Sequence, residues 1–206
     1  ATIGFRYGQF KIEGSSFTGR EPDENRYDFD TPRFDSWSTR LDYNPSGHWA
    51  LQVSHGFIKS PEALMPGEDV HRTTASATYS LPFGNNRTFN AAAVWGMNKT
   101  AGHAADNSIL LEGDIRIKKL DVYTRFEFVQ KTTEELNLNP LAYGDDTIVT
   151  VNAITLDLNY DPLKLGPLNL AAGGQLTYYG VASKLTSLYG SGPLGGEVFL
   201  RLYPRL

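Results

Sequence analysis

The sequence contains no cysteine, which excludes a disulfide framework, a thiolate metal site and thiol catalysis. It also lacks an excess of basic residues: 19 Lys and Arg stand against 23 Asp and Glu, for a net charge of −4. Because phosphate binding requires basic residues gathered into a patch or stripe, a nucleic-acid partner is not expected. The length of 206 residues suits a single domain over residues 1–206.

No segment reads as a membrane-spanning helix, which needs roughly 20 mostly apolar residues in succession. The longest window without a charge runs from Leu165 to Ser183, and it contains Pro167 and several glycines. Its apolar residues recur at every second position, which is the period of a strand. The chain begins at Ala1 directly inside a similar strand-like run, without a signal peptide, so a mature or truncated chain is expected.

Period-two alternation is the dominant pattern, and turn-forming residues separate the runs. In residues 120–130, Leu120, Val122 and Phe126 share one face, and Asp121 and Arg125 share the other. Most runs have 10 to 14 residues, longer than the usual five or six of soluble sheets and close to the roughly 9 to 11 of a tilted membrane-spanning strand. About eleven strands are predicted, at 2–7, 9–19, 35–44, 48–59, 70–82, 87–98, 107–118, 120–130, 147–160, 168–180 and 195–206.

The connections between these runs alternate in length. The short ones lie at 8–9, 45–47, 83–86, 118–119 and 161–166, and the long ones at 20–34, 60–69, 99–106, 131–146 and 181–194. Outer-membrane barrels have short periplasmic turns and long outer loops. The sequence therefore predicts an all-β, antiparallel, up-and-down transmembrane β-barrel.

The positions of the aromatic residues distinguish a membrane barrel from a soluble β-sandwich, which stays open as an alternative. A soluble core places its largest side chains in the middle of a sheet, whereas a membrane barrel has aromatic girdles around an aliphatic band. The predicted girdle at the short turns contains Tyr7, Phe10, Tyr43, Trp49, Tyr79, Phe89 and Tyr160, and the one near the other ends contains Trp37, Phe57, Trp95, Phe128 and Tyr178.

Charged residues occupy the opposite faces of the same strands, in nearly equal numbers of each sign. Dry and unpaired, each would cost several kcal/mol against a total stability of about 5–15 kcal/mol, so they must face water or one another. We expect them to line a polar lumen, as Arg6, Lys11, Glu13, Arg40, Asp42, Arg72, Glu112, Asp114, Arg116, Asp121, Arg125, Glu127, Asp157, Glu197 and Arg201. This near balance predicts weak ion selectivity.

The predicted number of about eleven strands is odd, which conflicts with a rule for membrane barrels. Bacterial single-chain barrels have even strand numbers, and closure requires the last strand to pair with the first. An even total of 12 to 16 strands is therefore expected for the intact barrel; either the pattern misses a strand or N-terminal strands are lacking from this chain.

Five stretches are similar to a poorly characterised family of porin-like Gram-negative outer-membrane β-barrel proteins. They are EGSSFTGREPDENRYDFD at 13–30, SPEALMPGEDVHRTTAS at 60–76, the pair Trp95-Gly96, EFVQKT at 127–132 and PLGGEVFLRLYP at 193–204. The resemblance implies location in a bacterial outer membrane and further strands before the start of this chain. It implies no particular activity.

The leading functional expectation is a channel for small polar solutes or ions, with the lipid bilayer as its surroundings and no cofactor. A structural or interaction protein with a salt-bridge-filled lumen and ligand-binding outer loops stays open, with protein partners and oligomeric state undetermined. An outer-membrane hydrolase built from Asp69, His71, Asp106 and the Ser54-His55 pair is less favoured, and we expect no enzyme.

Metal binding finds little support in the sequence. The four histidines are His48, His55, His71 and His103, and none pair at zinc-ligand spacing on one strand face. The charge-dense loop at 20–30 allows a cation site, although a solvated loop with Arg–carboxylate pairs is favoured. No metal site is predicted.

Overall fold

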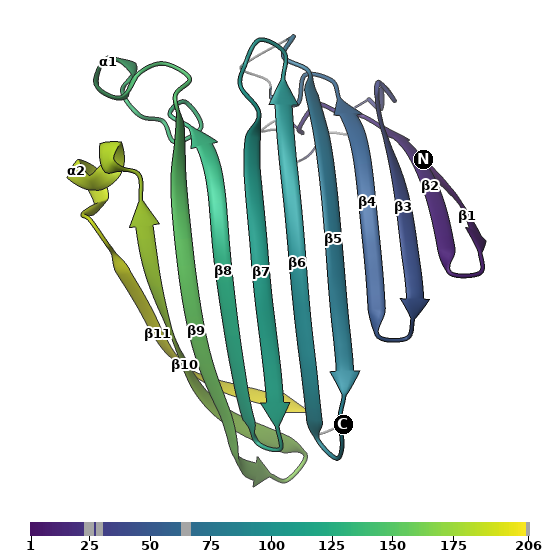
Figure 1. The fold of residues 1–206 in the computed structure, drawn as a ribbon, viewed down its shortest axis with the longest axis vertical. Helices are drawn as coiled ribbons and strands as arrows, with labels where there is room; N and C mark the ends of the chain where they lie inside the picture. The colour runs from purple at the N-terminus through teal and green to yellow at the C-terminus, as the bar shows by residue number, and fades with distance from the viewer. Residues whose placement is uncertain (23–26, 28–30, 63–66, 205–206) are drawn as a thin grey trace. The chain divides into compact units, whose positions relative to one another are not determined.

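The computed structural model describes residues 1–22, 27, 31–62 and 67–204. Strands of one antiparallel sheet dominate them (Figure 1). The strands are β1 (Thr2–Tyr7), β2 (Phe10–Phe17), β3 (Ser36–Ser46), β4 (Trp49–Ile58), β5 (Val70–Pro82), β6 (Arg87–Thr100), β7 (Asp106–Ile117), β8 (Leu120–Thr132), β9 (Ile148–Leu165), β10 (Leu168–Val181) and β11 (Leu194–Pro204).

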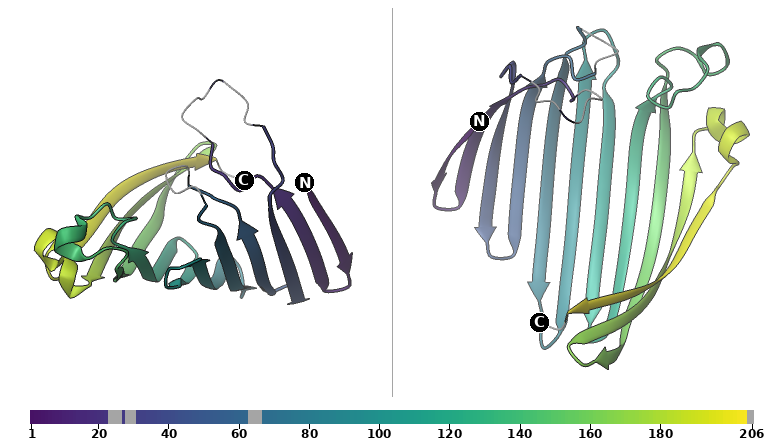
Figure 2. Two further views of the ribbon diagram at one scale, coloured as in Figure 1. Left: turned by 90° about the horizontal axis from the view of Figure 1, so that it is seen from above. Right: turned by 180° about the vertical axis from the view of Figure 1, so that it is seen from behind.

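Each strand neighbours the next one along the chain, in the order β1 to β11, so the predicted all-β, up-and-down antiparallel fold is confirmed. The chain divides into two compact units. Unit 1 comprises residues 1–77 and 94–107, and unit 2 comprises residues 78–93 and 108–206. In unit 2, β9, β10 and β11 follow one another, as the view from behind shows (Figure 2).

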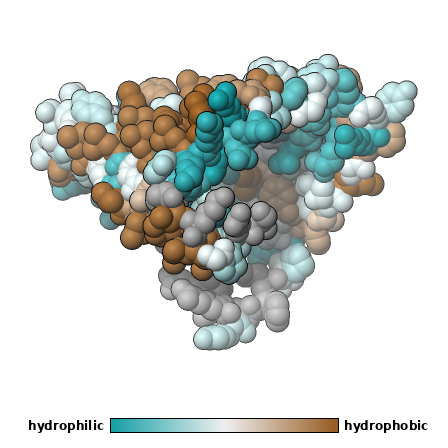
Figure 3. Space-filling model, turned by 90° about the horizontal axis from the view of Figure 1, so that it is seen from below, coloured by the Kyte–Doolittle hydropathy of each residue, from teal (hydrophilic) through white to brown (hydrophobic). Residues whose placement is uncertain are grey.

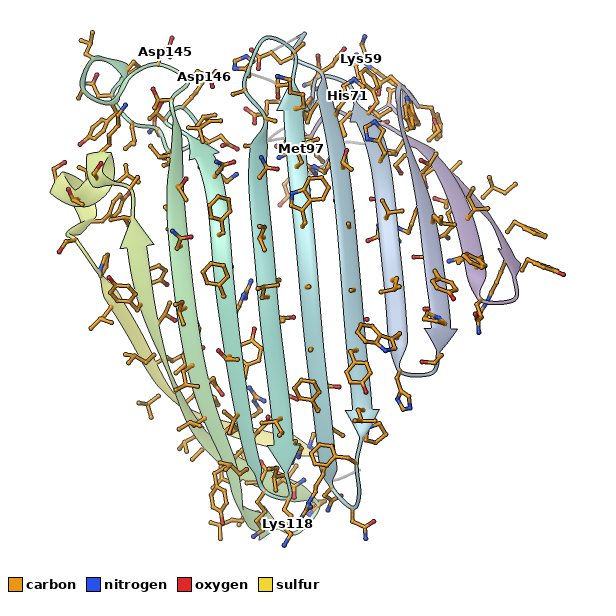
Figure 4. All side chains as sticks on the ribbon, in the orientation of Figure 1. Lys59, His71, Met97, Lys118, Asp145 and Asp146 are labelled. Carbon is orange, nitrogen blue, oxygen red and sulfur yellow. The ribbon has the colours of Figure 1, made fainter. Side chains whose placement is uncertain are left out.

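The connections alternate between short and long, as predicted. Gly8, Lys118 and Gly166 each adopt a positive φ near 57–59° in a short turn, the left-handed conformation that tight hairpins require. Figure 4 labels Lys118 at one end of unit 2, with Asp145 and Asp146 at the other end in a long loop. The connection predicted at 99–106 is shorter than expected, because β6 continues to Thr100 and β7 begins at Asp106.

The predicted end of the ninth strand at residue 160, with a turn at 161–166, is wrong. β9 continues to Leu165, and the turn is formed by Gly166 and Pro167. Tyr160 pairs with Ala172 and Leu163 pairs with Leu170, so the register shifts between them. Pro162 falls in this irregularity, where the N–H that proline lacks is not needed for a regular ladder. Tyr160 consequently lies inside its strand and not at its end.

Two long loops of unit 2 contain short helices that the sequence pattern did not predict: α1 (Pro140–Tyr143), the 3₁₀ helix η1 (Ser183–Leu185) and α2 (Thr186–Tyr189). The side chain of Asn139 accepts a hydrogen bond from the Leu141 N–H, which caps α1. Gly144, with φ at 87°, ends it. The predicted end of the last strand, residues 205–206, lies outside the described residues.

The molecule buries very few apolar side chains. Among the described residues, the buried hydrophobic ones are Val149, Ala153, Ala171 and Leu185. Large apolar side chains instead stay exposed along whole strand faces, and the surface separates into hydrophobic and hydrophilic patches (Figure 3). In the part of the chain that the structure describes, no helix is long and apolar enough to span a membrane.

Candidate functional site: the polar and apolar faces of the sheet

In unit 2, the pairing registers bring the predicted charged residues of β7, β8, β9 and β11 onto one face, here called polar face 2. Glu112 lies opposite Arg125, Arg116 lies opposite Asp121, and Tyr123 lies between Asp114 and Asp157. The face comprises the expected residues Glu112, Asp114, Arg116, Asp121, Arg125, Glu127, Asp157, Glu197 and Arg201.

Arg116 is the centre of the ion-pair network on this face. Its Nη1 lies 3.9 Å from Oδ2 of Asp121, and its Nη2 forms an ion pair with Oδ2 of Asp161. Arg125 forms a second ion pair with Glu127 at 2.9 Å. Asp161 was assigned to a turn in the sequence analysis, and the extension of β9 is what brings it onto the face.

Neutral donors hold several other carboxylates of polar face 2. The Tyr123 hydroxyl donates to Glu112 at 2.7 Å, and the Asn90 amide donates to Asp114 at 2.9 Å. The Gln175 amide donates to Glu197 at 3.2 Å. A neutral donor orients a carboxylate without cancelling its charge, so these groups stay available to attract cations.

The charges of polar face 2 are not balanced. Among the described side chains, it carries four basic residues, which are Arg116, Arg125, Lys131 and Arg201, and seven carboxylates, which are Glu112, Asp114, Asp121, Glu127, Asp157, Asp161 and Glu197. Arg201 also lies over the Phe199 ring, 5.4 Å from its centroid. The near balance was expected for the charged residues of the whole chain; within this unit carboxylates are in excess, because Asp161 joins the face and because the two signs are unevenly distributed along the sequence.

Unit 1 has its own polar face, here called polar face 1, with the expected residues Arg6, Lys11, Glu13, Arg40, Asp42 and Arg72. Lys11 forms an ion pair with Glu13 at 2.8 Å. Arg72 donates to Asn98 at 2.7 Å, and Asn98 in turn donates to Asp106 at 3.1 Å. Asp106, predicted in a loop, therefore joins this face as its third carboxylate.

Uncharged side chains connect β4 and β5 on polar face 1. The Ser54 and Thr74 hydroxyls lie 2.7 Å apart, the Gln52 amide donates to Thr74 at 3.3 Å, and Ser76 donates to Gln52 at 3.1 Å. On β4 and β5, these side chains of polar face 1 are uncharged hydroxyl and amide groups, whereas many side chains of polar face 2 are charged.

The opposite faces carry the aromatic residues of the predicted girdles. Phe10 stacks on Tyr43 with ring centroids 4.5 Å apart in unit 1, and Tyr79 packs at a tilt against Phe89 in unit 2. The other predicted members at strand ends are Tyr7, Trp49, Trp37, Phe57, Phe128 and Tyr178. Trp95 lies farther from an end, and its indole donates to Asn107 at 3.2 Å. The interface role of these rings stays a prediction.

A hydrogen-bonded cluster joins the long loop after β2 to the end of β4. The Gly19 N–H donates to Asp35 at 3.0 Å, and the buried Ser36 hydroxyl accepts from the Lys59 N–H at 2.9 Å. The Gly19 hydrogen bond is the main cause that lowers the pKa of Asp35 below its usual range. Neither loop was expected to contact the other, since loop packing leaves no periodic signal in a sequence.

A second loop contact follows β8. Glu135 accepts hydrogen bonds from Lys131 at 2.9 Å and from the Thr132 N–H at 3.0 Å. Partial burial raises the pKa of Glu135, but the hydrogen bonds from Lys131 and Thr132 outweigh it and leave the pKa below its usual range. Tyr143 and Ser187, from two different loops, have hydroxyl oxygens 3.4 Å apart.

The residues of the hydrolase alternative are not assembled into a catalytic group. Ser54 lies on polar face 1, whereas His55 lies on the opposite face and contacts Thr73. Asp69 accepts a hydrogen bond from the Ser60 N–H, and Asp106 accepts one from Asn98. Adjacent residues of a strand point to opposite faces, so Ser54 and His55 cannot act on one substrate atom.

Histidines 55 and 71 lie side by side, on neighbouring strands. Their ring centroids are 5.7 Å apart with an interplanar angle of 21°, and the rings of Trp37 and Phe57 flank them. Spacing within one strand cannot reveal such a pair. In the charge-dense loop, for which a solvated loop was favoured over a cation site, residues 23–26 and 28–30 lie outside the described residues.

The comparisons with known proteins support the fold and no particular activity. No protein-family model matches the chain, and no curated protein sequence matches it. Among solved structures, it is similar to in-vitro folded OmpT, an outer membrane protein of Vibrio cholerae, with a TM-score of 0.51 and 10% sequence identity. The match covers 98% of this chain and 63% of that one, so this chain spans less than two thirds of the neighbour's length. The fold resembles that of an outer-membrane β-barrel protein.

Proposed function

We propose that this chain belongs to a channel of the bacterial outer membrane that conducts small polar solutes and ions past its two polar faces. One observation carries the proposal. The sheet separates charged from apolar side chains by face, and the apolar side chains stay exposed. Ile154, Leu156 and Leu158 of β9 are each at least half exposed.

Lipid accounts for the apolar face. Monomeric soluble proteins rarely expose contiguous apolar patches of more than a few hundred Å², whereas hydrocarbon is the natural surrounding of such a face in a barrel. Aromatic rings toward the strand ends match the interfacial belts of membrane proteins.

Water accounts for the polar faces. Among the described residues, Asp121 Oδ1, Asn159 Oδ1, Asp161 Oδ1 and Arg125 Nε are buried and make no hydrogen bond to another residue. Buried polar atoms in proteins are nearly always hydrogen-bonded, to water where protein offers no partner. The ion-paired side chains of Arg116, Arg125 and Glu127 nevertheless stay 37%, 39% and 33% exposed, which favours a hydrated face over the structural alternative of a face sealed by salt bridges.

The imbalance of charge on polar face 2 predicts an ion selectivity for the channel. Fixed rings of charge decide which solutes enter a pore, and an excess of carboxylates raises the local concentration of cations. Polar face 1 carries four basic residues and the three carboxylates Glu13, Asp42 and Asp106, and it does not offset this excess. We therefore expect a preference for cations over anions.

Planar-bilayer recording tests the function. The folded protein is expected to give discrete conductance steps, with a reversal potential in a KCl gradient that reports cation preference. Gel migration before and after boiling checks folding in the same sample, because folded membrane barrels change mobility. A folded sample that inserts and remains silent would contradict the channel, and conductance without cation preference would contradict the role of polar face 2 alone.

A further inference from the structure

His55 and His71 form a compact pair of imidazoles on the apolar face of unit 1. His55 lies opposite Thr39 in the register that also pairs Leu41 with Val53, so it shares their face. Both histidines are exposed, and His71 lies near the start of β5, at the end of the sheet where Figure 4 also labels Lys59. The two accessible imidazoles and the neighbouring Thr39 and Thr73 therefore form a small polar spot on a mainly apolar surface.

The hydrogen bond of His55 defines which of its nitrogens is free. Nδ1 lies 2.9 Å from the Thr73 hydroxyl. In the tautomer whose Nδ1–H donates to the Thr73 hydroxyl, Nε2 is the nitrogen whose lone pair is available. Histidines that bind metals commonly use one nitrogen in this way while the other is held by a hydrogen bond, which fixes the orientation of the ring.

We propose that His55 and His71 together bind one divalent transition-metal ion of the imidazole-preferring class, such as Cu²⁺ or Zn²⁺. The ring separation of 5.7 Å lets small side-chain rotations direct one nitrogen of each ring toward a shared ion. The flanking rings of Trp37 and Phe57 restrict both imidazoles to this neighbourhood.

The donor set decides the class of metal. Two neutral nitrogens without a carboxylate suit copper, zinc or nickel and are poor ligands for Ca²⁺ or Mg²⁺. In the described part of the chain, no group of three or more histidine, aspartate, glutamate or cysteine side chains is placed to hold a metal. The site therefore offers two protein ligands and leaves the remaining positions to water or to oxygens from the surroundings, which makes the ion exchangeable.

Cu²⁺ binding to the folded protein in detergent micelles tests this site independently of any conductance. The wild type is expected to bind one Cu²⁺ with nitrogen coordination in its electron paramagnetic resonance spectrum. His55→Ala and His71→Ala should each weaken the binding about tenfold or more, and Thr73→Val should weaken it by about tenfold, because it removes the partner of Nδ1. The other two histidines supply matched controls: His48→Ala and His103→Ala should bind as the wild type does.

A measurement on the wild-type chain covers the case of variants that fail to fold. Cu²⁺ should protect His55 and His71, and not His48, from modification by diethyl pyrocarbonate. Equal binding by the His55 and His71 variants, loss of binding in His103→Ala, or unprotected imidazoles at saturating Cu²⁺ would each overturn the proposal.

Discussion

The backbone N–H of Gly19 and the carboxylate of Asp35 join the two ends of a long loop, with a hydrogen bond of 3.0 Å. The Ser36 hydroxyl donates to the same oxygen at 3.2 Å, and it accepts from the Lys59 N–H. Glu21 donates from its backbone to Pro61 at 2.9 Å. The loop after β2 therefore contacts the loop after β4, because backbone groups of one loop satisfy those of the next.

The close approach at Gly19 predicts that Gly19→Ala destabilises the protein. A Cβ at this position would meet the Lys59 carbonyl oxygen at 2.6 Å and the Lys59 nitrogen at 2.7 Å, and backbone atoms cannot move aside easily. Overpacking of this kind typically costs about 1–3 kcal/mol. Denaturant unfolding in lipid vesicles would measure the loss. Gly14→Ala in β2 is the control, because nothing lies within 4 Å of the Gly14 Cβ position. Equal effects of the two variants would contradict the packing argument.

The lowered pKa of Asp35 predicts that the loop contact weakens in acid. A carboxylate whose folded pKa is depressed stabilises the fold fully above its unfolded pKa of about 3.9, and the contribution is lost as pH falls through the folded pKa. Hydrogen exchange of the Gly19 amide, expressed as a protection factor to remove the intrinsic pH dependence, should therefore fall below about pH 4.

Asp35→Asn separates titration from geometry in that experiment. Its side-chain oxygen still accepts the Gly19 N–H but does not titrate. We expect protection in this variant to be lower at neutral pH than in the wild type and to stay level in acid. The same acid-induced loss in Asp35→Asn would assign the effect to another group.

Most of the fold could be predicted because a sheet with one apolar and one polar face has apolar and polar residues at alternate positions of each strand. β8 shows this fully: Phe126 and Arg125 are neighbours in sequence and belong to opposite faces. The prediction failed in β9, where Pro162 imitates a turn signal while the strand continues past it. A proline at an irregularity keeps its local signature whether the chain turns or not.

The candidate site was predictable as a set of residues and not as a set of contacts. Charged positions of polar face 2 follow from alternation, but the sharing of Arg116 between Asp121 and Asp161 depends on the register of three strands. The contact between His55 and His71 also depends on strand register. It could not be predicted, because the two residues lie on neighbouring strands joined by a loop, and the length of a loop does not determine which residues pair across the strands.

Arg116 is expected to contribute measurably to stability. Arg116→Ala removes the partner of Asp161, whose side chain is only 14% exposed, and leaves that carboxylate uncompensated. More than a third of the Arg116 side chain is exposed, so solvent screening limits the expected loss to about 1 kcal/mol. Unfolding in guanidinium would detect it. Arg6→Ala, at an exposed position of β1, should change stability by less than about 0.5 kcal/mol. A loss as large for Arg6→Ala as for Arg116→Ala would remove the network from the explanation.

The excess of carboxylates on polar face 2 predicts that neutralising two of them reduces cation preference. Glu112→Gln retains the oxygen that accepts from Tyr123, and Asp157→Asn lies nearby, since Asp157 pairs with Tyr123 across the strands. The double variant should lower the cation-to-anion permeability ratio by about twofold or more, because each fixed charge contributes to the local cation concentration. Reversal potentials in a KCl gradient measure the ratio. The charge-preserving double variant Glu112→Asp with Asp157→Glu is the matched control, and its ratio should remain near that of the wild type. If both double variants lower the ratio equally, side-chain length and not charge controls selectivity at this face.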